Sequence, residues 1–149
     1  MKPVMNETEL KEFLLNAYPQ IFDMYPGFSV ERVAPGLVDV VMETDERHIR
    51  AGGTISGPTI FSLADMGGYA CVLSHIGREA LAVTTNLNLN FMRKAPPGPM
   101  LARYRILKLG KRLMVFDSQI TSIGSDDLVA HATGTYAIPP RSVEQGRPV

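Results

Sequence analysis

The longest apolar stretch of the chain runs from Ser56 to His75 and carries one formal charge, at Asp65. Ser56 is a favoured helix N-cap residue, Pro58 is tolerated in a first turn, and Gly77 is a typical helix end. The pattern therefore predicts one long helix that is apolar on most sides. Such a helix has to be buried by other elements.

The remaining apolar residues indicate strands. Residues 28–44 read as two β-branched runs joined by Pro35 and Gly36, which is typical of a hairpin. Further extended segments cover residues 81–92, 100–110, 113–123 and 128–138. In the segment 81–92, strict alternation predicts an apolar, helix-facing side and a polar side. The apolar side would hold Leu81, Val83, Thr85, Leu87, Leu89 and Phe91, and the polar side Thr84, Asn86, Asn88 and Asn90.

The order of these elements predicts an α+β fold in which an antiparallel sheet wraps around the long helix. Asn6 followed by Glu9 indicates a helix start, so a short amphipathic helix is expected at residues 7–18. Gly67 and Gly68 have no side chains, which would let the sheet or a second subunit approach the long helix closely. We expect a single domain over residues 1–149, with a loosely attached tail from about residue 140.

Composition narrows the function classes. Fifteen Lys and Arg residues balance fifteen Asp and Glu residues, so no overall positive field favours nucleic acid or an anionic membrane. The N-terminus does not resemble a secretory signal, and no later segment resembles a membrane span. The single Cys71 excludes an intramolecular disulfide, so a cytoplasmic protein is expected. The three histidines are too scattered for a metal motif. We expect His48 to be solvated in a loop and His75 to interact with the helix dipole.

Asp65 is the main candidate for chemistry. A carboxylate on an apolar helix loses hydration, which neighbouring groups must replace. The sequence therefore predicts either a structural anchor or a tuned acid or base.

Several motifs, in this order and spacing, resemble the hotdog-fold acyl-CoA thioesterases of the phenylacetate-degradation and 4-hydroxybenzoyl-CoA thioesterase-like type. They are the helix start "SGPTIFSLAD", the strand "AVTTNLNLNFMRKAPPG", the turn "LGKR" and the ending "LVAHATGTYAIP". The resemblance covers residues 30 to 138. It implies hydrolysis of acyl-CoA thioesters without metal or cofactor, at sites between the subunits of a homodimer or homotetramer.

The resemblance also implies roles for individual residues. Asp65 would be the catalytic base or nucleophile, and the N–H of Gly57 would polarise the thioester carbonyl. The family carries a hydroxyl residue near the start of the strand after the helix. This position corresponds to Thr84, which would hold water or Asp65, and Thr85 is the second choice. Three further positions fall in the family's loop before the helix. Gly53 matches its first glycine, whereas Arg50 and Ser56 replace its asparagine and histidine.

The two replaced positions leave alternatives open. Arg50 could pair with Asp65, stabilise the thioester oxygen or bind a carboxylate on the acyl group, and Ser56 could be only an N-cap. Phe61 and Tyr69, with Met66 and Met92, would line an apolar acyl pocket or fill core. Arg93, Lys111 and Arg112 could meet CoA phosphates or form a solvated face. A noncatalytic acyl-CoA-binding protein is the main alternative function, and a structural interaction module is the third.

Overall fold

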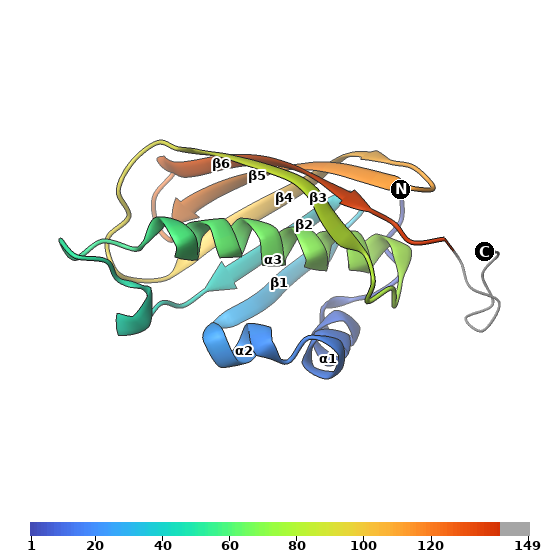
Figure 1. The fold of residues 1–149 in the computed structure, drawn as a ribbon, viewed down its shortest axis with the longest axis horizontal. Coiled ribbons are helices and arrows are strands. Elements are labelled where there is room, and N and C mark those ends of the chain that lie inside the picture. The colour runs from blue at the N-terminus through green and yellow to red at the C-terminus, as the bar shows by residue number, and fades with distance from the viewer. Residues whose placement is uncertain (141–149) are drawn as a thin grey trace.

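A single six-stranded sheet with a long helix across one face forms the body of the protein (Figure 1). The computed structural model describes residues 1–140. All strand pairs are antiparallel, and the strand order is β1-β2-β4-β5-β6-β3. The predicted α+β arrangement, a sheet wrapped around a central helix, is confirmed. The α-helices and strands are α1 (Glu7–Ala17), α2 (Gln20–Met24), β1 (Phe28–Ala34), β2 (Leu37–Met42), α3 (Gly57–Ile76), β3 (Val83–Phe91), β4 (Met100–Leu109), β5 (Leu113–Ser122) and β6 (Leu128–Ala137).

The ends of α3 lie where the sequence predicted them. Ser56 is the N-cap, and its Oγ accepts a 3.3 Å hydrogen bond from the N–H of Thr59. Gly77 ends the helix at φ 100°, a left-handed backbone that favours glycine. Although α3 is 20 residues long and mostly apolar, no helix among the described residues is long and apolar enough to cross a membrane.

Two aromatic rings of the sheet explain the paired glycines of α3. A Cβ at Gly67 would overlap the ring of Tyr104, and a Cβ at Gly68 would come within 2.6 Å of Phe116. The hydroxyl of Tyr104, on β4, donates a hydrogen bond to the carbonyl of Leu63. The close approach expected at these glycines is therefore made by side chains of the sheet.

The N-terminal segment packs against the hairpin and the far end of α3. The predicted capping box is present, because Asn6 and Glu9 each accept a backbone hydrogen bond from the other. The N–H of Val4 donates to the carbonyl of Ser74, which ties the segment to α3.

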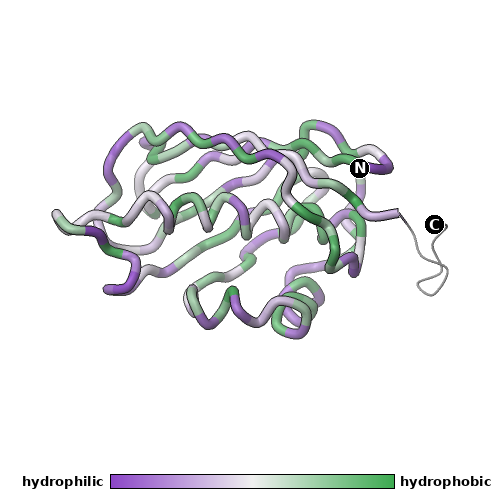
Figure 2. The backbone as a smooth tube through the Cα atoms, viewed as in Figure 1, coloured by the Kyte–Doolittle hydropathy of each residue, from purple (hydrophilic) through white to green (hydrophobic). Residues whose placement is uncertain are grey.

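The five-residue helix α2 was not predicted. Figure 2 shows hydrophobic and hydrophilic positions alternating along the strands beside α3.

A β-bulge in β3 overturns the predicted alternation. Thr84 pairs with Tyr136 and Asn86 pairs with Thr135, so Thr85 has no cross-strand partner. The extra residue moves Thr84 to the helix-facing side, and the prediction that Thr85 would lie there is wrong. Leu81 precedes the strand and is 76% exposed, so it is not on the apolar side either.

The expected tail lies almost wholly in residues 141–149, outside the described residues.

Strand β3 lies at one end of the sheet and pairs only with β6 among the described strands. Val83 and Phe91, at its two ends, are each 55% exposed.

Candidate active site

The carboxylate of Asp65 is held by two hydroxyl groups from the sheet. Oγ1 of Thr84 donates a 2.6 Å hydrogen bond to Oδ1 of Asp65. The hydroxyl of Tyr136 donates to the same Oδ1 at 3.1 Å and to the backbone carbonyl of Asp65 at 2.8 Å. Cross-strand partners project from the same face of a sheet, and Thr84 and Tyr136 are such a pair. The two hydroxyls therefore replace hydration that the helix carboxylate loses.

Asp65 lies at a pocket of about 360 Å³. Its lining is mostly apolar and aromatic, apart from the Asp65 carboxylate and the hydroxyls. Tyr69 stacks on Tyr136 with ring centroids 6.2 Å apart, and Tyr18 meets Tyr69 edge-on at 6.0 Å. The lining residues are Ala17, Tyr18, Asp65, Met66, Tyr69, Ala80, Ala82, Val83, Thr84 and Tyr136. A mostly apolar pocket with a few convergent polar groups is typical of a small-molecule site.

Only some of the predicted site residues meet at this pocket. Asp65, Thr84 and Tyr69 do, as does Met66. The hydroxyl of Thr85 instead donates to the carbonyl of Thr135, and Thr85 is exposed.

Tyr136 is not among the site residues predicted from the sequence. Alternation along β6 places residues 130, 132, 134 and 136 toward the helix, and Tyr136 is the only phenol in that row. A buried tyrosine hydroxyl usually has a partner. That rule would have singled out Tyr136 as a polar group facing α3.

A second group of predicted residues surrounds the start of α3. The N–H of Gly53 donates to the carbonyl of Arg50 in a turn, and Gly53 has a φ of 82°. Oγ of Ser56 lies 2.7 Å from Oγ1 of Thr59, in addition to its cap bond. Gly57 is the first residue of the helix. Because Ser56 is the N-cap, Gly57 is fixed as the first helical residue.

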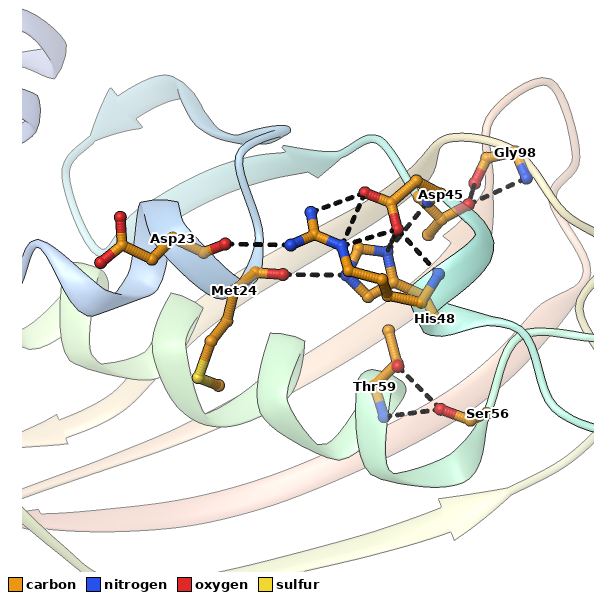
Figure 3. A network of polar contacts seen from close by, with 9 residues as sticks. Asp23, Met24, Asp45, His48, Ser56, Thr59 and Gly98 are labelled. Atoms are coloured by element: carbon orange, nitrogen blue, oxygen red, sulfur yellow. Dashed lines mark hydrogen bonds and ion pairs between the residues drawn. The ribbon is translucent and has the colours of Figure 1, made fainter.

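His48 holds the loop before α3 in place (Figure 3). Its Nδ1 accepts from the N–H of Asp45 at 3.0 Å, so Nε2–H donates to the carbonyl of Met24, also at 3.0 Å. The carbonyl of His48 in turn accepts from the N–H of Ser56. His48 is only 3% exposed, so the prediction of a solvated side chain is wrong. Beside it, hydrogen bonds from Arg47 lower the pKa of Asp45 to about 2.

The two groups of residues are far apart along α3. Asp65 lies eight positions beyond Gly57, which corresponds to about 12 Å of helix. The described residues contain no ion pair between Arg50 and Asp65, and Arg50 is exposed. Within one chain, Asp65 is thus held by hydroxyls of the sheet and not by Arg50.

The remaining substrate-binding candidates lie outside the pocket. Phe61, on the second turn of α3, is 43% exposed. Arg93 forms a 3.4 Å ion pair with Asp127, near the turn between β5 and β6. Lys111 and Arg112 lie in the turn between β4 and β5, at the opposite end of β5. One end of the sheet therefore carries Arg93 and the other Lys111 and Arg112.

His75 and Cys71 are buried in the core. Nε2 of His75 accepts a 2.9 Å hydrogen bond from the N–H of Gly36, and burial lowers the pKa of His75. Since Nε2 carries no proton, the protonated nitrogen of the neutral ring is Nδ1, which lies 3.1 Å from the carbonyl of Cys71 near the C-terminal end of α3. Burial raises the pKa of the Cys71 thiol to about 12, which makes Cys71 a poor nucleophile at neutral pH. No group of three metal-ligating side chains occurs within residues 1–140.

Comparison with known proteins identifies the family. Residues 52–129 match the thioesterase superfamily, and the chain belongs to it. A Silicibacter sp. TM1040 protein described as a "putative thioesterase" is 46% identical, with a TM-score of 0.85 over 94% of this chain and 96% of that one. A variant of the phenylacetic acid degradation protein PaaI from Thermus thermophilus is 25% identical, with a TM-score of 0.69 over 81% of this chain and 99% of that one. The resemblance to this branch of hotdog proteins is confirmed.

One further relative was solved with a ligand. A Streptococcus mutans UA159 protein bound to acetyl CoA is 25% identical, with a TM-score of 0.67 over 75% of this chain and 88% of that one.

Proposed function

We propose that this protein is an acyl-CoA thioesterase that hydrolyses a thioester to a free acid and CoA. The observation that carries the proposal is the Asp65 carboxylate, which is oriented by Thr84 and lies at a mostly apolar pocket. Membership of the thioesterase superfamily and the acetyl CoA bound to the Streptococcus relative support it.

The reaction needs one water molecule and no redox partner. As a general base, Asp65 takes a proton from water while the water oxygen attacks the thioester carbonyl carbon. As a nucleophile, it attacks that carbon itself, and water then hydrolyses the resulting anhydride. In both routes the C–S bond breaks, the sulfur leaves as the CoA thiolate or thiol, and the acid is released.

An N–H donor for the developing oxyanion would come from a second copy of the chain. Gly57 of the same chain is about 12 Å from Asp65 along α3, too far to contact one thioester carbonyl. The edge of the sheet at β3 offers unpaired backbone groups, and exposed Phe61, Phe91 and Met92 lie near the start of α3. A homodimer built on this edge would bring Gly57 of one copy near Asp65 of the other, and dimers could pair into tetramers.

The proposal is tested by hydrolysis of a panel of acyl-CoAs, with release of free CoA thiol as the measurement. The panel should hold short, medium-chain and aromatic acyl groups, and acyl groups with a terminal carboxylate that Arg50 could bind. We expect saturable turnover of at least one thioester. Ligand-induced thermal stabilisation without hydrolysis of any member would instead support a noncatalytic acyl-CoA-binding protein. A monomeric mass at micromolar concentration would contradict a site shared between subunits.

Replacing Thr84 by Val should lower turnover by about 10-fold, because the carboxylate loses a hydrogen bond worth about 1.5 kcal/mol and its fixed orientation. The measurement is kcat on the best acyl-CoA of the panel. Thr85→Val is the matched control, since Thr85 is the next residue along the chain but bonds only to the Thr135 carbonyl. Equal losses in the two variants would contradict the assignment of the hydroxyl to Thr84.

A further inference from the structure

The bonding around Asp65 is asymmetric. Both hydroxyl donors, from Thr84 and Tyr136, point at Oδ1. Within residues 1–140, no hydrogen bond or ion pair reaches Oδ2 of Asp65. One oxygen of the carboxylate is thus fixed by the protein, and the other is left for a ligand.

The hydroxyl of Tyr136 also fixes the helix at this residue. Its single hydrogen is shared between the backbone carbonyl of Asp65 and Oδ1. A donor that bridges the main chain and the side chain of one residue restricts the rotation of that side chain. Thr84 alone could follow the carboxylate if it turned, but a bond to both groups of Asp65 resists the turn.

The position of the Tyr136 ring is itself set by packing. Tyr136 is 2% exposed and lies between Tyr69, at 6.2 Å, and Phe116, at 6.1 Å. Burial and, next in size, the nearby Asp65 carboxylate raise the pKa of Tyr136. The phenol therefore remains a protonated donor at neutral pH.

We propose that Tyr136 is a positioning residue that holds Oδ1 of Asp65 and thereby presents Oδ2 to the pocket as the reacting oxygen. The inference rests on the proposed function, because it assigns the reacting atom of that same site. Tyr136 would not touch the reacting atoms of the substrate. It acts through the Asp65 carboxylate.

The test compares Tyr136→Phe with Tyr104→Phe. Both replacements remove one buried phenol oxygen that donates to a carbonyl of α3, but only Tyr136 also donates to a carboxylate. We expect Tyr136→Phe to lower kcat about 10-fold, with KM within about two-fold of wild type. Tyr104→Phe should leave both kcat and KM within about two-fold of wild type.

Thermal denaturation checks that Tyr136→Phe and Tyr104→Phe both remain folded. A loss of kcat confined to Tyr136→Phe, with KM unchanged, then reports on the position of the Asp65 carboxylate. A wild-type kcat in Tyr136→Phe, or equal losses of kcat in the two variants, would overturn the inference. Failure of Tyr136→Phe to fold would overturn it as well, since Tyr136 would then serve only the core. The proposed function fails separately, if Asp65→Asn keeps wild-type turnover.

Discussion

Replacing Asp65 by Asn should reduce acyl-CoA hydrolysis by about two orders of magnitude or more while the protein remains folded. The amide keeps the shape of the side chain and can still accept from Thr84 and Tyr136. It cannot take a proton from water or attack the thioester as a carboxylate does. Steady-state turnover on the best substrate of the panel measures the loss, and circular dichroism and mass in solution check the fold and assembly.

Asp117→Asn is a suitable control for this prediction. Asp117 is also a largely buried carboxylate, but it lies on the other face of the sheet and pairs with Arg105 and His131. Its replacement should leave kcat within about two-fold of wild type. If Asp65→Asn hydrolysed its substrate at the wild-type rate, Asp65 would not be the catalyst. If it lost its fold first, Asp65 would be a structural anchor.

Replacing Gly67 by Ala should lower the free energy of unfolding by about 2 kcal/mol. Alanine is the better helix former by up to about 1 kcal/mol, so propensity alone predicts a gain. The new Cβ, however, would overlap the ring of Tyr104, whose hydroxyl is bonded to the Leu63 carbonyl. The ring cannot move aside without breaking that buried bond. Urea denaturation measures the change: the midpoint urea concentration should fall while the denaturant slope m stays constant.

Gly110→Ala provides the comparison for this prediction. Gly110 does not have a left-handed φ, and the nearest atom to a Cβ there would be the carbonyl oxygen of Leu113 at 3.5 Å, an ordinary contact. Its replacement should change stability by less than about 1 kcal/mol. A stabilising effect of Gly67→Ala would show that the sheet is not packed against α3 as closely as described.

Local signals in the sequence determined most of the fold. Ser56 and Gly77 set the two ends of α3, because capping and a left-handed C-terminal residue depend on adjacent residues alone. The isolation of Asp65 on that helix was equally readable, since helix periodicity places it among apolar neighbours. The hairpin and the later strands followed from β-branched runs separated by turn residues.

The family resemblance placed a hydroxyl at Thr84, but only the tertiary structure shows how Thr84 and Tyr136 together hold Asp65. Thr84 faces the helix because a bulge shifts the register of β3 by one residue, and a one-residue shift exchanges the two faces of a strand. Nothing in the local sequence marks that shift, so alternation pointed to Thr85. Tyr136 lies 71 residues beyond Asp65 along the chain. Their contact depends on β6 pairing with β3 over α3, a long-range arrangement that local propensity and spacing do not specify.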